Sequence, residues 1–483
     1  MLDLFDIIYV PFIFFFFLFF FNLGWKQIKL LIFFLSNYIY INSLFFFIFF
    51  DCNNTQYQFI KTINWITNLN INYSLGLDGF SIYFFLLTTF LIPICILVSW
   101  NTIRIFIFEY FFLYIFLEIL VINAFCVIDL LFFYIFFEIL LIPMFLLIGI
   151  WGSRDRKLKA SYFFFFFTFL GSIFMILSIF FIYSFIGSTD VIIIASYFFD
   201  IKNQIIFFFF LFFTFSIKIP IVPLHLWLPE AHVEAPTSGS IFLAGILLKL
   251  GTYGLIRFCF LLFPDACVFY SPLVNTLSII GIFYISMIAI RQNDIKKIIA
   301  YSSISHMNYI VLGMFSFELI GLEGSIFLMM CHGLVSSALF CSIGILYDRY
   351  KTRLISYYSG IVNFMPLFSF FFFLFFCANI SFPGTCSFIG EFFTLFGCFL
   401  VYKWISVLIL ISTFFNTVYM SLLYNKLFFK FSKSYLIYSD LIRREFFLLV
   451  IFFFLILFFG FYLLFFNYNL YFCSLYIISF LIY

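Results

Sequence analysis

Ionisable residues inside long apolar segments are the part of this sequence best able to do chemistry. Four of them lie where charge is otherwise scarce: Glu138, Lys218, Lys249 and Glu391. A charge at the centre of a bilayer costs at least about 2.5–3.5 kcal/mol, so each residue needs a partner or a hydrated cavity. Carboxylates and lysines in that setting can accept and release protons. The four residues therefore predict a proton path inside a membrane protein.

A glutamate paired with a lysine has the right strength for such a path. Apolar surroundings favour the neutral form of a lysine, whereas a nearby carboxylate favours the charged form. If Glu138 approaches Lys218 and withdraws, a swing of about 3 pKa units would amount to about 4 kcal/mol. Moving one charge against about 180 mV costs a similar amount, at about 2.3 kcal/mol per 100 mV. The pair could therefore drive a proton uphill.

Histidine can relay protons between such sites, because its pKa in water is about 6.5. The chain has four: His225, His232, His306 and His332. His306 and His332 lie among serines that could hold ordered water, and we predict relay roles for both, with hydrogen-bonded core histidines as the alternative. For His225 and His232 the structural alternative is favoured. Glu230, Glu234, Arg257 and Asp129 are predicted to be supporting charges.

Metal and nucleotide chemistry are not expected in this chain. His225, Glu230, His232 and Glu234 are of metal-binding types, but Pro229 and Pro236 interrupt the helical register that would bring them together. The 11 cysteines are scattered without a C-x-x-C pair, which argues against a metal cluster or a disulfide framework. No glycine-rich phosphate-binding motif occurs. We therefore expect no cofactor and no metal here.

Prolines interrupt two of the apolar segments. Pro220 and Pro223 follow Lys218, and Pro383 lies within Ser381–Gly384, eight residues before Glu391. A proline removes one helical N–H and frees the carbonyl four residues earlier. Broken helices that carry an ionisable residue are typical of ion and proton paths.

The composition requires these residues to be held by a polytopic membrane protein. Of 483 residues, 66% are hydrophobic and only 9% charged. A membrane span needs about 20 apolar residues. We predict an all-α protein with about fourteen transmembrane helices, the first of them a retained span rather than a signal peptide. Their approximate ranges are 5–21, 30–50, 78–99, 105–126, 128–150, 160–186, 205–228, 238–263, 271–290, 298–316, 320–347, 360–402, 404–428 and 445–466.

Charge supports this series of spans. Loops after odd-numbered spans hold eighteen Lys and Arg residues, against three in loops after even-numbered spans. Since positive loops stay inside, both termini are expected on the outer side. Discontinuous helices seven and twelve lie five spans apart, which predicts two inverted five-helix repeats, spans 4–8 (105–263) and 9–13 (271–428). Residues 1–104 would hold three spans and a long polar loop over 51–77, and 429–483 a loop, a last span and an apolar tail.

Several long segments resemble the antiporter-like, proton-translocating membrane subunits of NADH:ubiquinone oxidoreductase, respiratory complex I. They include DLLFFYIFFEILLIPMFLLIGIWGSRDRKLKA (129–160), PLHLWLPEAHVEAPTSGSIFLAGILLKLGTYGLIRF (223–258), RQNDIKKIIAYSSISHMNYIVLGMFS (291–316), HGLVSSALF (332–340) and PGTCSFIGEF (383–392). LPEAHVEAPTSGS and LYDRYKTR (346–353) favour the subunit 4 branch of that family in its mitochondrial form.

The resemblance implies a role for each predicted residue. Glu138 matches the family's glutamate of span five, Lys218 the lysine of broken span seven, and Lys249 the central lysine of span eight. His306 and His332 match polar links, and Glu391 the end of the exit half-channel. The resemblance also implies that NADH, FMN, iron–sulfur clusters and ubiquinone are bound by other subunits of the complex.

The same resemblance implies a setting. We expect a multi-pass protein of the mitochondrial inner membrane, with positive loops on the matrix side and both termini on the intermembrane-space side. Its partners would be other membrane-arm subunits, especially neighbouring antiporter-like ones, and membrane lipids, with no nucleic acid. Two alternatives remain: a subunit of a multisubunit cation/proton antiporter, without redox coupling, or a structural membrane-arm subunit that moves no protons.

Overall fold

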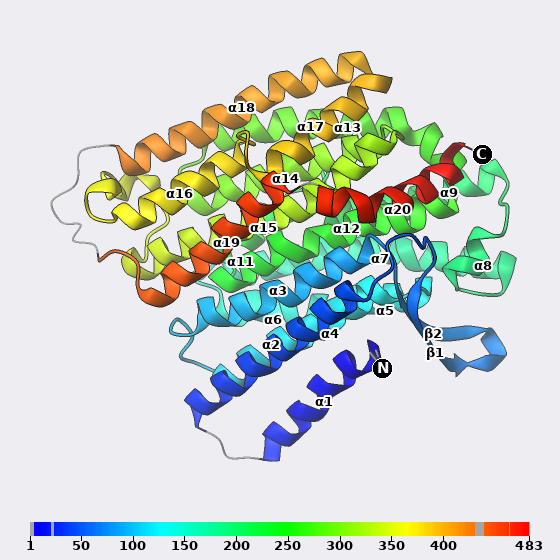
Figure 1. The fold of residues 1–483 in the computed structure, drawn as a ribbon, viewed down its shortest axis with the longest axis horizontal. Coiled ribbons are helices and arrows are strands. Elements are labelled where there is room, and N and C mark those ends of the chain that lie inside the picture. Colours follow the sequence, from blue (N-terminus) through cyan, green and yellow to red (C-terminus); the bar gives the residue numbers. More distant parts are fainter. Residues whose placement is uncertain (1–3, 21–23, 430–438, 463, 483) are drawn as a thin grey trace. The chain divides into compact units, whose positions relative to one another are not determined.

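The computed structural model describes residues 4–20, 24–429, 439–462 and 464–482, and they are mostly helical (Figure 1). Within those ranges, eleven helices are long and apolar enough to cross a membrane. Many of their outward side chains are large and apolar: Phe166 is 61% exposed and Phe414 is 64% exposed. Exposure of that kind is stable only against lipid or another protein.

The chain forms two compact units, and each has its own buried helices. The first comprises Met1–Lys218, Ile246–Ser271 and Tyr468–Tyr483. Its elements are α1 (Leu4–Phe20), α2 (Trp25–Ile48), β1 (Gln58–Ile66), η1 (Thr67–Leu69), β2 (Ile71–Leu77), α3 (Ser81–Ser99), α4 (Ile107–Cys126), α5 (Leu130–Ile139), α6 (Leu141–Trp151), α7 (Lys157–Ile186), α8 (Val191–Ala195), α9 (Ile201–Lys218), α12 (Leu248–Gly254), η3 (Leu255–Phe260) and most of α20 (Leu464–Ile482).

The second unit comprises Ile219–Gly245 and Pro272–Asn467. Its elements are α10 (Trp227–Glu234), α11 (Thr237–Phe242), most of α13 (Pro264–Arg291), α14 (Ile295–Met314), α15 (Leu319–Tyr350), η4 (Ile355–Tyr357), η5 (Ile361–Asn363), α16 (Pro366–Asn379), α17 (Cys386–Val401), α18 (Lys403–Phe428) and α19 (Arg443–Phe461). A short segment, η2 (Leu243–Leu247), lies where the chain passes from this unit back to the first.

The region 51–77 contains a β-hairpin, which corrects the expectation of an all-α fold with a long polar loop there. Strands β1 and β2 pair antiparallel, with Thr62 opposite Ser74 and Asn64 opposite Asn72. Asn70, at the turn, has a φ of 50°, a left-handed conformation that asparagine tolerates. No residue of β1 is buried. Because neither face of β1 is buried, its sequence need not alternate apolar and polar residues as a half-buried strand does.

Two helices end beside the residues predicted to carry protons. α9 ends at Lys218, two residues before Pro220, and the chain is not helical again until Trp227. α5 ends at Ile139, directly after Glu138, and α6 begins at Leu141. Pro143 explains the second break, because its missing N–H leaves the carbonyl of Ile139 without a helical partner.

The helix that carries Lys249 is irregular on both sides of that residue. η2 and η3 are π-helical, and the α-helical segment α12 lies between them along the chain. π-helical turns are rare and occur frequently at functional sites. Lys249 is the second residue of α12 and is fully buried.

Glycines allow α15 and α17 to pack backbone against backbone. A Cβ atom on Gly397 of α17 would lie 2.5 Å from the Cα of Gly321 on α15. A Cβ on Gly324 would lie 2.8 Å from the backbone nitrogen of Thr394. The close approach keeps Glu391, which lies on the same helix as Gly397, buried at 6% exposure.

A Gly397→Ala chain is expected to be less stable by about 1–3 kcal/mol, because the added methyl group must push two backbones apart. The midpoint of thermal unfolding of the assembled complex, and the amount of complex recovered, would both fall. Gly149→Ala is the matched control, since its Cβ would meet only the Ser161 side chain at an ordinary 3.6 Å. Equal midpoints and yields for the two variants would show that α15 and α17 can separate without cost.

Candidate functional site

Lys218 is held in an aromatic cage at the end of α9. Its side chain is 2% exposed, and its Nζ lies 4.4 Å from the ring centre of Phe137 and 5.8 Å from that of Phe164. Among the described residues Nζ has no hydrogen-bond partner. Aromatic faces attract a cation, yet they offer no atom that can accept its protons. The ammonium group is therefore buried without a hydrogen-bond acceptor among the described residues, and aromatic faces lie beside it.

Glu138 is the carboxylate that acts on Lys218. The two side chains interact electrostatically but do not form an ion pair within 4.0 Å. The Ser172 hydroxyl on α7 also interacts with the Glu138 carboxylate, while Oε1 of that carboxylate is buried without a hydrogen-bond partner among the described residues. The two charges therefore interact without a direct contact that would hold the side chains together. A switch requires this freedom, because the two groups must be able to approach and separate.

Arg257, on η3, is tied into a buried ion pair. Its Nη1 lies 2.8 Å from Oδ2 of Asp78, and the two side chains are 4% and 9% exposed. Its Nε donates to the hydroxyl of Tyr253 at 3.4 Å, and that hydroxyl donates to the Phe125 carbonyl at 2.9 Å. Lys249, Tyr253 and Arg257 are spaced four residues apart along this helix. Arg257 was predicted from sequence to be a supporting charge, but its partner Asp78 was not identified.

Asp129 caps a helix. Its Oδ1 accepts hydrogen bonds from the backbone N–H groups of Leu131 and Phe132, at 2.8 and 3.2 Å, and Thr189 donates to its Oδ2 at 2.6 Å. Capping satisfies N–H groups at the start of α5 that have no partner within the helix. The structure gives Asp129 a role in positioning α5, the helix that ends directly after Glu138.

In the second unit, three side chains meet near the break between α16 and α17. Nδ1 of His306 lies 3.0 Å from Oε1 of Glu391, and Nε2 of His306 lies 3.2 Å from Oδ1 of Asn379. The ring of His332 is 5.7 Å from that of His306, between centroids. All four side chains are at most 6% exposed. The sequence predicted three of these residues, and the structure brings them together.

This arrangement can hold one proton in two places. An N–H at Nε2 is required for a hydrogen bond to the Asn379 carbonyl oxygen. Nδ1 of His306 and Oε1 of Glu391 are the two atoms between which one proton can be exchanged, at 3.0 Å. The contact does not have hydrogen-bond geometry, because Oε1 has no hydrogen-bond partner among the described residues, so exchange requires a small rotation of one of the two side chains.

The other charged residues of the loop region have separate partners. Glu230 pairs with Lys297 at 2.8 Å, and Glu234 lies 3.9 Å from Arg353. His232 stacks on Phe340 with ring centroids 4.9 Å apart. The ring of His225 is 6.1 Å from that of Tyr284, on another helix. His225, Glu230, His232 and Glu234 therefore do not converge on a common point, and the described residues include no group of three or more metal-ligating side chains.

Several polar residues of these sites were missed in the sequence. Asn379 is a lone amide at the end of a phenylalanine run, directly before the Ser381–Gly384 break, and that contrast could have identified it. Lys296 is 1% exposed and donates to the Ala235 carbonyl at 2.9 Å, beside Glu234. Glu118 on α4 is fully buried, and neither carboxylate oxygen has a hydrogen-bond partner among the described residues.

Comparison with known proteins gives consistent matches over most of the chain. A family model described as NADH:quinone oxidoreductase/Mrp antiporter, TM, matches residues 127–416. NADH-ubiquinone oxidoreductase chain 4 of Marchantia polymorpha is 46% identical over 86% of this chain and 84% of its own length. The protein of that name from Triticum aestivum is 49% identical over 89% and 88%.

Solved structures share the fold. A chain of respiratory complex I from Thermus thermophilus with bound NADH superposes with a TM-score of 0.87 at 26% identity, over 94% of this chain and 95% of that one. A chain of the Mrp complex from a Dietzia species superposes with a TM-score of 0.84 over 95% of both chains, at 18% identity, which shows the fold alone. The resemblance drawn from the sequence motifs is confirmed by these matches.

Proposed function

The chain belongs to the NADH:quinone oxidoreductase/Mrp antiporter family, within it to chain 4 of NADH-ubiquinone oxidoreductase, and on that premise we propose that protons cross it along its buried Glu, Lys and His residues. It is a proton-translocating, multi-pass inner-membrane subunit of an NADH:ubiquinone oxidoreductase. The redox cofactors, in our proposal NADH, FMN, iron–sulfur clusters and ubiquinone, are carried by other subunits of the complex.

The observation that carries this proposal is the caged ammonium of Lys218 within the electrostatic reach of Glu138. When Glu138 is charged and close, Lys218 retains its proton. When that carboxylate is neutralised or moves away, the aromatic cage of Phe137 and Phe164 alone cannot hold the charge, and the proton passes on. We assign Lys249, buried between two π-helical segments, to the next step.

The contact of His306 with Glu391 supplies the last step of the proposed route. His332 is close enough to pass a proton to His306 through one intervening water or side-chain hydroxyl, and Glu391 releases it toward the outer side. His225, His232, Glu230, Glu234, Arg257 and Asp129 are assigned supporting roles through the partners described above. No metal takes part in the proposed route.

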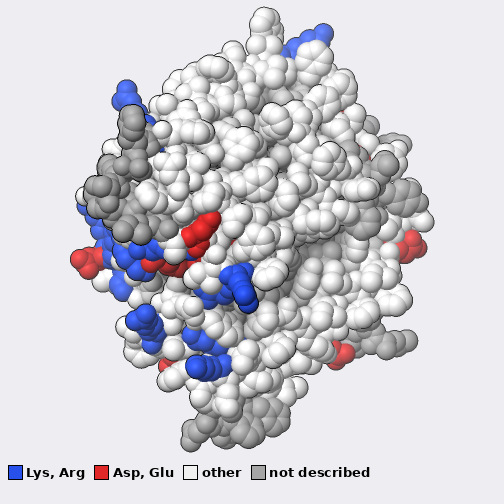
Figure 2. Space-filling model, turned by 60° about the vertical axis from the view of Figure 1, so that its left-hand side comes forward, with Lys and Arg blue, Asp and Glu red and all other residues white. Residues whose placement is uncertain are grey.

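For membrane topology, we propose fourteen spans that include two inverted repeats over 105–263 and 271–428, with discontinuous helices seven and twelve. The positively charged loops lie on the matrix side of the mitochondrial inner membrane, and both termini face the intermembrane space. In Figure 2, most Lys and Arg residues of that view gather toward its left, while a wide area of surface carries no charged residue. Lys430 and Lys433 of the positive loops lie outside the described residues.

The partners in this proposal are other membrane-arm subunits, with neighbouring antiporter-like subunits foremost. Large exposed side chains such as Trp404, 84% exposed on α18, and Phe198, 96% exposed, would be covered by those subunits or by lipid.

Replacing Glu391 by Gln is expected to reduce proton uptake driven by NADH to roughly a fifth. Removing one general acid–base group typically slows proton transfer by a hundredfold or more, and water can take over part of that function. A glutamine amide can still donate to Nδ1 of His306 but cannot carry the exchangeable proton. The measurement is acidification of vesicles that contain the purified complex.

Glu318→Gln provides the matched control for this measurement, because Glu318 lies at the start of α15 in the same unit and is partly exposed. Its uptake should equal that of the wild type. If Glu391→Gln also pumps at the wild-type rate, then the contact of Glu391 with His306 is structural and the proposed exit is wrong.

A further inference from the structure

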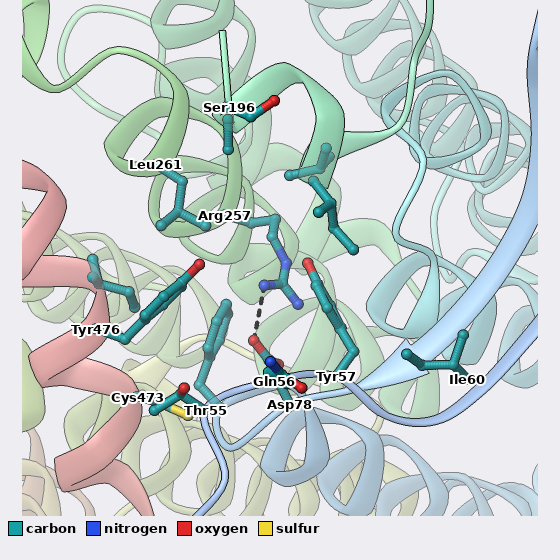
Figure 3. Close-up of a pocket in the computed structure, with 15 residues that line it drawn as sticks. Thr55, Gln56, Tyr57, Ile60, Asp78, Ser196, Arg257, Leu261, Cys473 and Tyr476 are labelled. Carbon is teal, nitrogen blue, oxygen red and sulfur yellow. Dashed lines mark ion pairs between the residues drawn. The ribbon is translucent and has the colours of Figure 1, made fainter.

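A cavity of about 540 Å³ lies in the first unit, bordered by segments far apart in the sequence (Figure 3). The loop before β1 contributes Thr55, Gln56 and Tyr57, and α20 contributes Cys473 and Tyr476. The volume is within the range of small-molecule binding sites, about 300–1,000 Å³. None of the residues assigned to proton transfer above lines it, apart from the supporting Arg257.

Arg257 faces this cavity with one unused donor. Its guanidinium lies between the rings of Tyr57 and Phe80, 4.6 and 4.8 Å from their centres, and Figure 3 shows its ion pair with Asp78. Nη1 contacts Asp78 and Nε contacts Tyr253, but Nη2 has no hydrogen-bond partner among the described residues. A buried donor without an acceptor is costly, so an acceptor brought by a ligand would bind well here. Arginine is suited to phosphate oxygens in particular.

The lining of the cavity carries no net charge. Among the described residues that line it, Arg257 and Asp78 are the only charged side chains, and burial raises the pKa of the Tyr57 phenol, which therefore stays neutral. A simple anion would meet the carboxylate of Asp78 as well as the guanidinium. A zwitterion can instead place its phosphate on Arg257 and its ammonium toward Asp78 and the tyrosine rings, where cations are favoured.

The mouth of the cavity combines apolar and polar side chains, since Gln56 and Ser196 line it and are exposed beside larger apolar and aromatic residues. Ile60, Ile192 and Tyr476 line it and are 50%, 53% and 44% exposed. The cavity also lies beside the start of the membrane-spanning helix α3 and the end of η3, so its depth corresponds to the membrane–water interface, where tyrosines are enriched. Acyl chains leaving the cavity would cover the exposed Ile60 and Ile192, which a ligand without an apolar part would leave exposed.

We propose that this cavity binds the headgroup of a zwitterionic phospholipid, with a phosphodiester oxygen accepting from Nη2 of Arg257 and the ammonium group facing Asp78. The acyl chains pass out over Ile60 and Ile192. The proposal does not depend on the proton route, because the one residue they share, Arg257, has only a supporting role in that route.

The test uses the purified complex in non-ionic detergent and a phosphatidylethanolamine that carries a photoactivatable group on its headgroup. After irradiation, mass spectrometry should locate adducts on peptides containing residues 55–60, 191–196 and 471–477. Ile192→Trp, which fills the mouth, should reduce the adducts about tenfold, because the added ring occupies the space through which the acyl chains leave. Ile193→Trp is the matched control, because Ile193 is equally exposed at 49% but does not line the cavity.

Arg257→Lys tests the phosphate contact, because lysine keeps the charge beside Asp78 but has no second nitrogen for the ligand. Arg257→Lys should lower the adduct yield as Ile192→Trp does. If the Arg257→Lys complex does not assemble, the comparison of Ile192→Trp with Ile193→Trp alone tests whether the cavity binds the lipid. Equal adducts in Ile192→Trp and Ile193→Trp, or adducts absent from the three peptides in the wild type, would refute the site.

Competition identifies the class of ligand. Unlabelled phosphatidylethanolamine or phosphatidylcholine should displace the probe, and inorganic phosphate should not. If phosphatidylglycerol or inorganic phosphate displaces the probe better than phosphatidylcholine does, the site selects anions and the zwitterionic assignment is wrong. Proton uptake measured on the same Ile192→Trp complex reports separately on pumping, so the lipid site and the proton route can fail independently.

Discussion

A Glu138→Gln chain is expected to assemble normally and to lose at least about nine-tenths of its NADH-driven proton uptake, since 1.4 kcal/mol already corresponds to a factor of ten in rate. Glutamine has nearly the same shape and can still bond to Ser172, so the packing at the end of α5 is kept. What disappears is the negative charge that acts on Lys218 across the gap between them. Without that charge, only the faces of Phe137 and Phe164 would stabilise a charged Lys218. The lysine therefore remains neutral throughout the pumping cycle.

The measurement is NADH-driven acidification of vesicles containing the purified complex, normalised to the amount of complex. Glu109→Gln is the matched control, because Glu109 is an exposed glutamate in the first turn of α4 in the same unit. Wild-type uptake in both variants would leave this chain a structural subunit. Loss of assembly in Glu138→Gln alone would instead show that the carboxylate is needed for folding.

Replacing Lys249 by Ala is expected to have an effect as large as that of Glu138→Gln. Lys249 is fully buried in α12, and the chain offers no second lysine within the same helix to take its place. The substitution removes a charge that is costly inside a membrane. The free energy gained in this way offsets part of the free energy lost because the missing side chain leaves a cavity. Assembly should therefore survive while uptake falls to about a tenth or less.

Lys202→Ala controls for the loss of a lysine as such, because Lys202 is exposed near the start of α9. Uptake and NADH oxidation should be measured on the same preparations. Normal oxidation with uptake retained in Lys249→Ala would contradict a central role for this lysine, whereas a fall in both quantities together is the outcome expected of a tightly coupled pump.

Local signals in the sequence predicted part of the fold correctly. Pro220 predicted the end of the helix at Lys218, because a proline acts on the four residues before it and no distant contact is needed to see its effect. Pro143 carried the same information about Glu138, but it was overlooked within a strongly apolar run. The hairpin over Gln58–Leu77 could not be found from periodicity, since β1 buries no residue.

The sites were predictable to the extent that unusual residue types marked them. His306, His332 and Glu391 stand out as polar residues in apolar helices, and the structure brings them together. The pairing of Arg257 with Asp78 joins residues far apart in the sequence, and no pattern within either segment specifies the other. The π-helical turns around Lys249 likewise depend on packing and not on a local signal.

The glycine contact between α15 and α17 also bears on the abundance of phenylalanine in this chain. On α17, Phe388, Phe392, Phe396 and Phe399 are 36–52% exposed, whereas Gly390, Glu391, Thr394 and Gly397 on the opposite face are buried. α15, which is wholly buried across its apolar window, contains two phenylalanines, and α7, which is 39% buried, contains ten. On α17 these four phenylalanines therefore lie on the outward face, and the small residues of the opposite face leave room for Glu391 beside α15.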